Sequence, residues 1–246
     1  MASHRPLFDL TTSETVRLRY APGTGEDLVI SFSSIGRKRG EMPPDEFRGT
    51  ILSDPTRHGL FVSDIRRSWL NDPHLCDVLA AAVEGIRQNS SVKRVSTIGL
   101  SMGGFSALAA SALFPVHAAL AISPQFSMVP GKIPGETRWR YWRKQIKAFR
   151  FETAEVAPPP GWALTLHGLL DDHCHMAAFT PRRGLDQFGF PDQTHSGLGG
   201  YLRNRDALAS LLTAAIAHDR RQFARLIKAA GGGWRRTVLA QKAAPQ

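Results

Sequence analysis

The sequence predicts an α/β fold in which a mostly parallel central sheet carries helices on both faces. Short apolar runs, typical of buried strands, alternate with runs whose apolar residues recur at helical spacing. Glycine- and proline-rich turns separate these runs, as expected for repeated strand–helix–strand units. Hydrophobic residues make up 42% of the 246 residues, which is enough apolar material for a sizeable core and argues against a disordered chain.

The first half of the chain supplies three expected strands and one long helix. Residues 15–20 (TVRLRY) alternate apolar and polar side chains, which is typical of a strand with one solvent-facing side. Residues 28–32 (LVISF) and 59–62 (GLFV) are nearly continuous apolar runs, as in central strands buried on both faces. Residues 74–87 place apolar side chains at helical spacing and predict a helix.

The second half continues the alternation. The expected strands are residues 95–99, 118–122, 162–166 and 184–190. The expected helices are residues 103–114, which are rich in small side chains, and residues 198–217. We expect a single α/β domain over residues 1–218, followed by a basic C-terminal helix and tail over residues 219–246.

A cap insertion is expected at roughly residues 126–160, between two of these strands. It contains RWRYWRKQIKAFR (residues 138–150), with six cations and four aromatic residues in thirteen positions. On a helix, one apolar stripe would run along Trp139, Trp142, Ile146 and Phe149. We therefore predict a short basic helical cap that packs this stripe onto the domain. The glycine-rich basic stretch at residues 231–236 is expected to be a flexible tail that could dock to a partner.

The charge is strongly basic. Lys and Arg number 31 against 21 Asp and Glu, a formal net charge of +10. Such an excess is compatible with nucleic acid, an anionic substrate, a membrane surface or an acidic partner. No RNP, KH or phosphate-binding glycine motif supports nucleic acid, which is the less favoured partner. An anionic substrate held by the cap remains open.

Other composition features point to a cytoplasmic protein. No apolar run reaches the roughly 18 residues of a membrane helix, and residues 1–14 lack the apolar core of a secretory signal. Cys76 and Cys174 form neither a disulfide scaffold nor a zinc pattern. We expect no membrane span, no metal and no organic cofactor, and the sequence leaves the oligomeric state open.

The most specific motif is Gly99-Leu100-Ser101-Met102-Gly103-Gly104, which matches G-x-S-x-G. An expected strand leads into it and an expected small-residue helix leads out of it. A strand-to-helix turn this tight strains the central residue and crowds its neighbours two positions away, where glycine removes the obstructing Cβ. The serine hydroxyl is then presented above the sheet, beside the N–H groups that begin the helix. Ser101 is therefore the candidate nucleophile.

This segment resembles the nucleophile elbow of the α/β-hydrolase superfamily, which implies an acid and then a histidine later in the chain. The strand at residues 162–166 runs into His167-Gly168-Leu169-Leu170-Asp171-Asp172, which is similar to the acid loop of that superfamily. The resemblance assigns the acid to Asp171, with Asp172 as the alternative one residue on. A capping role for either aspartate is the structural alternative.

The base must follow the acid. Four histidines do so, at positions 173, 175, 195 and 218. The first two lie too close to Asp171 for the superfamily's layout, and His218 lies at the end of a late helix. His195 lies in a polar loop between an expected strand and an expected helix, where the resemblance places the histidine. A surface histidine with no catalytic task is the structural alternative.

The resemblance also implies an oxyanion hole. One donor is the backbone N–H of Met102, directly after the nucleophile. The second comes from the loop at residues 32–36, where the backbone N–H of Ser34 is chosen, with the register open by one residue either way. Asp64, in a strand-to-loop turn also similar to the superfamily, is given a structural role.

The polar run Asp171 to His175 could ligate a metal, but no second cluster of ligands is visible, so an acid loop is favoured. The predicted function is therefore a serine hydrolase that cleaves an ester or similar acyl bond of a small-molecule or saccharide substrate. Two alternatives remain: an acyltransferase to a sugar or alcohol, or a non-catalytic binding protein on this fold that uses its basic surface. Contact between His195 and Ser101 separates the last from the first two.

Overall fold

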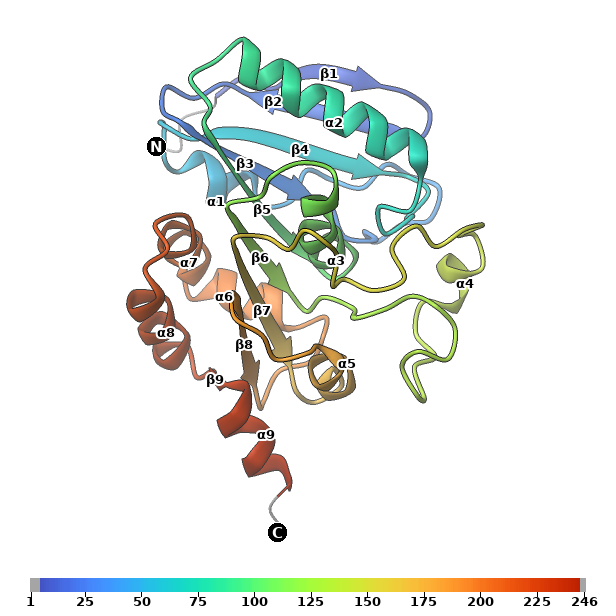
Figure 1. Ribbon diagram of the computed structural model, residues 1–246, viewed down its shortest axis with the longest axis vertical. Helices are drawn as coiled ribbons and strands as arrows, with labels where there is room; N and C mark the ends of the chain where they lie inside the picture. The colour runs from blue at the N-terminus through green and yellow to red at the C-terminus, as the bar shows by residue number, and fades with distance from the viewer. Residues whose placement is uncertain (1–4, 244–246) are drawn as a thin grey trace.

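The computed structural model describes residues 5–243, so residues 1–4 and 244–246 of the expected domain and tail lie outside it. Within these residues one sheet has the strand order β1-β2-β4-β3-β5-β6-β7-β8-β9 (Figure 1). The strands are β1 (Phe8–Thr12), β2 (Val16–Ala21), β3 (Asp27–Phe32), β4 (His58–Asp64), β5 (Arg94–Leu100), β6 (Ala118–Ile122), β7 (Trp162–Gly168), β8 (Leu185–Phe190) and β9 (Gly233–Trp234). Strands β3 to β8 are parallel to one another, whereas β1, β2 and β9 pair antiparallel. The predicted fold class is confirmed.

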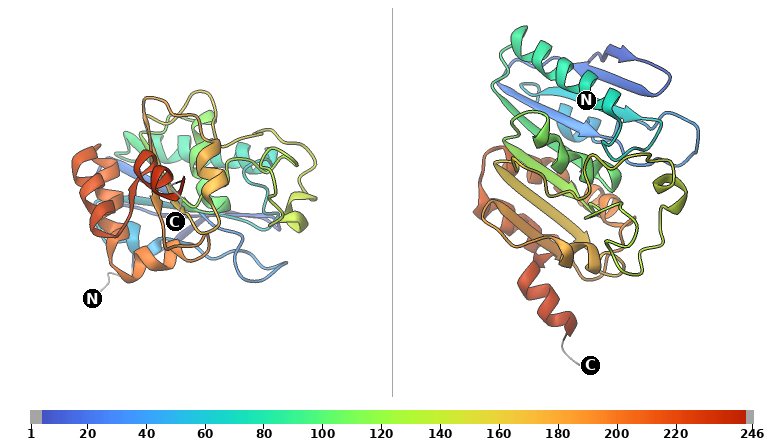
Figure 2. Two further views of the ribbon diagram at one scale, coloured as in Figure 1. Left: turned by 90° about the horizontal axis from the view of Figure 1, so that it is seen from below. Right: turned by 45° about the vertical axis from the view of Figure 1, so that its right-hand side comes forward.

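Helices cover both faces of the sheet (Figures 1 and 2). They are α1 (Arg48–Leu52), α2 (Pro73–Gln88), α3 (Met102–Ala109), α4 (Arg140–Arg143), α5 (His173–Ala178), α6 (Leu198–Asn204), α7 (Ala207–Ile216), α8 (Arg220–Ala229) and α9 (Arg235–Ala243). Alternate residues of a strand point to opposite faces. In β3, for example, Leu28 and Ile30 join the core under α2 and α3, whereas Val29 joins the core under α1, α7 and α8.

The strand order reverses direction at β3. The chain moves from β3 outward to β4 on one side, and then returns to place β5 on the other side. Loops that follow two such strands diverge, which leaves a crevice at their carboxyl ends, where α/β proteins bind ligands. The loop after β3 and the turn after β5 carry Ser34 and Ser101, so the fold brings the two predicted loops to the same crevice.

The segment at residues 126–160, where the cap is expected, is mostly irregular. It loops out beside α3 and α5, beyond the carboxyl ends of the strands (Figure 1). Its helix α4 is a single turn rather than the expected longer helix, and Trp139 precedes it with a left-handed backbone (φ 56°). The predicted packing is nevertheless found: Trp142 is buried in the core, and Trp139, Ile146 and Phe149 pack against it.

The C-terminal stretch differs from the expected flexible tail. Gly233 and Trp234 form β9, which pairs with β8 through Gly189 and Phe188. Helix α8 buries Phe223 and Ile227 in the core, and α9 follows β9 directly. The tryptophan explains the difference, because its ring packs on Phe188 with 4.3 Å between centroids. Within residues 5–243, no helix has both the length and the apolarity needed to cross a membrane.

Candidate active site

Ser101 lies at the tight turn between β5 and α3. Its backbone is held at positive φ (φ 57°, ψ −118°), a conformation that non-glycine residues adopt only under constraint. A Cβ on Gly99 would lie 2.1 Å from backbone atoms of Gly103, and a Cβ on Gly103 would lie 2.2 Å from the carbonyl oxygen of Phe32. Gly99 therefore allows the turn to close on itself, and Gly103 allows it to pack against β3.

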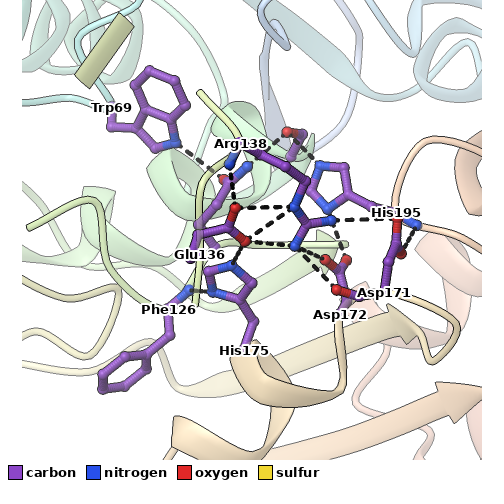
Figure 3. A network of polar contacts seen from close by, with 10 residues as sticks. Trp69, Phe126, Glu136, Arg138, Asp171, Asp172, His175 and His195 are labelled. Carbon is purple, nitrogen blue, oxygen red and sulfur yellow. Dashed lines mark hydrogen bonds and ion pairs between the residues drawn. The ribbon is translucent and has the colours of Figure 1, made fainter. Parts of the chain in front are cut away.

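His195 lies within hydrogen-bond distance of Ser101. Its Nε2 is 2.8 Å from Ser101 Oγ, and its Nδ1 is 2.7 Å from Oδ2 of Asp172 (Figure 3). An ionised carboxylate can only accept, so Nδ1 carries the proton and donates to Asp172. Nε2 then accepts a hydrogen bond from the Ser101 hydroxyl, which is the arrangement that a general base needs.

The carboxylate beside His195 belongs to Asp172 and not to Asp171, the first choice of the sequence analysis. Oδ1 of Asp171 instead accepts a hydrogen bond from the backbone N–H of His195 at 2.6 Å, and its side chain is 40% exposed. The chain turns once more after β7, where the N–H of Asp172 donates to the carbonyl oxygen of Gly168. After this turn the Asp172 side chain is fully buried and faces His195.

The acid loop and the histidine loop are packed backbone to backbone. A Cβ on Gly168 would lie 2.5 Å from the backbone of Thr194, and the N–H of Leu170 donates to the carbonyl oxygen of Gln193 at 3.0 Å. These contacts hold the two loops at a fixed separation. The imidazole of His195 is therefore positioned by its backbone as well as by its ring hydrogen bonds.

The Asp172 carboxylate is buried but charged. Burial alone would raise its pKa, yet the hydrogen bond from His195 and the nearby positive charge of Arg138 hold the pKa below the ordinary value for aspartate. Nη2 of Arg138 lies 3.0 Å from Oδ1, the oxygen that His195 does not use. Both oxygens of the carboxylate are thus satisfied, as a buried charge requires.

Arg138 comes from the cap and binds three carboxylates (Figure 3). Besides Asp172 it contacts Glu136, with Nη2 to Oε2 at 2.6 Å, and Asp171, with Nη1 to Oδ2 at 3.3 Å. Burial would lower the pKa of this guanidinium, but the bond to Glu136 and the surrounding negative charges raise it. The cap is therefore fastened to the acid loop by a permanently charged side chain.

A second histidine, His175, holds the cap in place through hydrogen bonds. His175, on α5, accepts a hydrogen bond at Nδ1 from the backbone N–H of Phe126 at 3.0 Å. Its Nε2 therefore carries the proton, and it donates to Oε2 of Glu136 at 2.9 Å. Although burial opposes it, this bond together with those from Arg138 holds the pKa of the Glu136 carboxyl well below its usual range.

Trp139 covers the imidazole of His195. Its ring lies against that of His195 with 4.8 Å between centroids and 53° between planes. The guanidinium of Arg138 lies 4.5 Å from the centroid of the same indole, a cation–π contact. The apolar stripe predicted for the cap thus begins with a residue that shields His195 from solvent, and His195 is 5% exposed.

Gln125 also contacts the serine, and the sequence analysis did not find it. Its Nε2 donates to Ser101 Oγ at 2.9 Å, and its Oε1 accepts from Nε1 of Trp69 at 3.0 Å. Gln125 follows β6, the strand next to β5, so its position at the carboxyl edge of the sheet could have been predicted from the expected strands. A single glutamine in a loop carries no motif, which is why the pattern did not single it out.

We compared the chain with known proteins. No family model matches it, and no curated protein matches it. Among solved structures, a 2,6-dihydroxy-pseudo-oxynicotine hydrolase superposes with a TM-score of 0.61 at 15% identity, covering 87% of this chain and 69% of that one. An esterase from Pyrobaculum calidifontis superposes with a TM-score of 0.59 at 12% identity, covering 88% and 87%.

A third similar structure is a capsule O-acetyltransferase of Neisseria meningitidis serogroup A. It has a TM-score of 0.59 at 15% identity, and the match covers 84% of this chain and 95% of that one. The chain has the α/β-hydrolase fold. At these identities the likeness establishes the architecture, and the chemistry of this α/β-hydrolase-fold protein must be argued from its own side chains.

The predicted oxyanion loop lies beside the elbow of this α/β-hydrolase fold. The N–H of Ser33 is used by the sheet, donating to the carbonyl oxygen of Val62 at 3.0 Å. Ser34 is the next residue, and its hydroxyl donates to Oε1 of Glu46 at 2.5 Å, which orients the loop. Met102 is the first residue of α3, a position whose N–H has no partner within its own helix.

Asp64 has the structural role expected of it. Its carboxylate accepts hydrogen bonds from the backbone N–H groups of Arg66 and Ser68, and from the Ser68 hydroxyl. Its burial raises the pKa of the carboxyl. The neighbouring Arg67 is fully buried and donates to four backbone carbonyl oxygens, which ties the turn to the loop after β3.

The polar run after β7 begins helix α5. His175 from this run binds Glu136, as described above, and Asp172 binds His195. Among residues 5–243, no group of three or more histidine, cysteine, aspartate or glutamate side chains is arranged to hold a metal ion. Three of the potential ligands in this run, Asp171, Asp172 and His175, therefore bind other protein groups.

The cap segment carries several exposed cations. Arg140, Lys144, Lys147 and Arg150 are exposed, and they follow Trp139 in the chain. Arg39, from the loop after β3, lies 4.2 Å from the ring centroid of Tyr141 on α4. The loop that carries Ser34 and the cap thus touch through this cation–π contact.

Proposed function

We propose that this protein is a serine hydrolase that cleaves an ester or similar acyl bond through an acyl-Ser101 intermediate. The observation that carries the proposal is the continuous hydrogen-bond chain from Ser101 through His195 to Asp172, at 2.8 and 2.7 Å. A serine hydroxyl is a poor nucleophile until a base removes its proton, and a base needs a carboxylate to hold its tautomer. This chain of contacts supplies both.

In the proposed reaction, Oγ of Ser101 attacks the acyl carbon while its proton passes to Nε2 of His195. The charge on the carbonyl oxygen is held by the backbone N–H groups of Met102 and Ser34. The protonated imidazole, stabilised by Asp172, then gives its proton to the leaving alcohol as the ester C–O bond breaks. The acyl group is left on Ser101.

Water then hydrolyses the acyl-Ser101 intermediate, with the proton transfers of the first step running in reverse. His195 takes a proton from the water, whose oxygen attacks the acyl carbon, and the proton returns to Oγ of Ser101 as the acid product leaves. No step in this scheme uses a group beyond the side chains and backbone named. The proposed substrate is an acyl ester of a small molecule or a saccharide, and the proposed location is the cytoplasm.

Transfer of the acyl group to a sugar or alcohol is the second candidate function. Two observations favour it: the capsule O-acetyltransferase among the similar structures, and the exposed cations of the cap, which suit an anionic acceptor. The two functions share the acylation step and differ only in the acceptor. They separate by product analysis, since an acceptor that is used accelerates turnover of an activated ester and appears as its acylated derivative.

The test is labelling of the purified protein with a fluorophosphonate probe, which reacts with activated serines. Wild-type protein is expected to be labelled, and Ser101→Ala and His195→Ala are expected to abolish labelling. Ser106→Ala, a change at a buried serine on α3, is the matched control and should leave labelling intact. Folded wild-type protein that stays unlabelled would contradict the proposal and favour the alternative of a non-catalytic binding protein.

A further inference from the structure

Gln125 is fully buried, and both the oxygen and the nitrogen of its side-chain amide make hydrogen bonds. It lies in the Ser123-Pro124-Gln125 segment that follows β6, and its side chain reaches Ser101. The only polar side chains in contact with Ser101 Oγ are His195 and Gln125 among the hydrogen bonds of residues 5–243. His195 is used in the proposed mechanism, and Gln125 is not.

The orientation of this amide is determined by its other partner. The indole Nε1–H of Trp69 can only donate, so the group 3.0 Å from it must be the carbonyl oxygen of Gln125. The amide nitrogen therefore faces Ser101, and it can only donate. Trp69 is itself fully buried, so the amide is held rigidly in this orientation.

A donor at this place has a partner at every stage of the proposed reaction. Before attack, Oγ of Ser101 gives its proton to Nε2 of His195 and accepts from Gln125 Nε2 at 2.9 Å. On attack, Oγ uses an electron pair to form the bond to carbon and becomes an uncharged alkoxy oxygen of the tetrahedral intermediate, which is a weaker acceptor than the oxyanion. The oxyanion forms on the same carbon, one bond away, and a hydrogen bond to a charged oxygen is the stronger one.

We propose that Gln125 is a catalytic residue whose side-chain amide donates an N–H to the oxyanion of the intermediate, in addition to the backbone donors. This inference rests on the proposed serine hydrolase function. Trp69 is then a positioning residue, which acts only by orienting Gln125. Donors that are buried and already oriented are worth most, because they need no reorganisation as charge develops.

The experiment compares the full-length wild type with Gln125→Ala, with the nearly isosteric Gln125→Glu, with Trp69→Phe, and with Trp69→Phe/Gln125→Ala. Gln145→Ala, at an exposed glutamine of the cap, is the matched control. The primary measurement is the second-order rate of fluorophosphonate labelling. Loss of one oxyanion donor typically costs about 10²–10³ in rate, and that loss is expected for both Gln125 variants. Thermal unfolding confirms that each variant is folded.

The two positions should be coupled. Trp69→Phe is expected to lower the labelling rate by a smaller factor, since the amide can still visit the productive orientation. The double variant should react no more slowly than Gln125→Ala alone, because Trp69 acts through an amide that is no longer there. Losses that multiply in the double variant would overturn the assignment of Trp69 as a positioning residue for Gln125.

A second measurement separates oxyanion binding from mere support of Ser101. The kcat/KM for p-nitrophenyl acetate is divided by that for its thiono analogue, in which sulfur replaces the carbonyl oxygen and accepts hydrogen bonds poorly. Removing a donor to the oxyanion lowers this ratio, whereas loosening Ser101 slows both substrates equally. An unchanged ratio, or labelling at the wild-type rate, would overturn the role of Gln125 while leaving the hydrolase proposal standing. Unlabelled wild-type protein would overturn both.

Discussion

Nη2 of Arg138 lies 3.0 Å from Oδ1 of Asp172, while Nδ1 of His195 lies 2.7 Å from Oδ2 of the same carboxylate. One carboxylate is thus shared between His195 and a cation from the cap. Because the guanidinium also binds Glu136, the orientation of Asp172 depends on a segment that lies outside the sheet. This relationship gives the cap a direct role in the geometry of the candidate site.

Removing this cation should impair the site without abolishing it. We expect Arg138→Gln to lower kcat by about 10²-fold, the usual size of a loss caused by misplaced catalytic groups. Arg138→Lys should recover only part of the activity, since an ammonium cannot span three carboxylates in a fixed fork. Steady-state kinetics on an aryl ester provide the measurement, and Arg140→Gln, at an exposed cation of the cap, is the control. Full activity of Arg138→Gln would contradict the idea.

Two adjacent aspartates give a clean test of the acid. Asp172→Asn should lower kcat by about 10⁴, because an amide no longer enforces the tautomer of the histidine that a serine needs. Asp171→Asn keeps an oxygen that can accept from the backbone N–H of His195, so its loss should be far smaller. The ratio of the two kcat values is the measurement. If Asp171→Asn were the more damaging, the acid would have to be reassigned.

The elbow glycines should be intolerant of even one methyl group. Gly103→Ala would place a Cβ 2.2 Å from the carbonyl oxygen of Phe32, backbone that cannot move aside. We expect a loss of about 1–3 kcal/mol or more in the free energy of unfolding by urea. Gly85→Ala on α2 is the matched control, since its Cβ meets nothing within 4 Å, and there alanine should stabilise by about 0.5–1 kcal/mol. Equal effects at the two sites would be inconsistent with this account.

His167 should make the fold sensitive to mild acid. It is fully buried on β7, and neither of its ring nitrogens has a hydrogen-bond partner among the described residues. Burial lowers the pKa of His167 to about 3. The unfolded chain, with an ordinary histidine pKa near 6.5, binds the proton first. Stability contributed by the neutral ring is therefore present above about pH 6.5 and is lost as the pH falls towards 3.

Replacing this ring should remove part of that sensitivity. Urea unfolding at pH 7, 6 and 5 is expected to show a shallower decline for His167→Phe than for the wild type. The difference is at most about 1.4 kcal/mol per pH unit, the value for one proton. His74→Gln, at an exposed histidine, serves as the control and should follow the wild type. Parallel declines for His167→Phe and the wild type would show that His167 is not the group responsible.

The parts of the fold that follow local rules were predictable. The parallel strands from β3 to β8 carry apolar runs because both their faces are buried, and these runs are visible in the sequence. The elbow was predictable because the steric crowding that requires its glycines arises within a few residues of Ser101. The sequence favoured Asp171 as the partner of His195 and left Asp172 as the alternative, and the structure has the contact at Asp172. The backbone hydrogen bond from Asp172 to Gly168, which forms the turn after β7, is not revealed by any side-chain pattern.

What could not be predicted depends on contacts between distant segments. Trp139 was assigned to an amphipathic helix of the cap, but the chain forms only a single turn there and the indole packs on His195, 56 residues further along. Arg138 was counted only as part of a basic run, although it is committed to three carboxylates. The tail at residues 231–236 was expected to be flexible because its glycines are flexible alone, and pairing with β8 overrides that tendency.

The dependence of Asp172 on Arg138 has a consequence for the order of events when the chain folds. In a chain whose residues 126–160 had not yet packed, Ser101 would lie at its turn between β5 and α3, but the contact of Arg138 with Asp172 and the cover of Trp139 over His195 would be missing. A newly folded sheet would thus carry a serine that is in place yet slow to react. Ser101 would become reactive only when the cap docks. The rate at which probe labelling appears during refolding would therefore report the docking of the cap rather than the formation of the sheet.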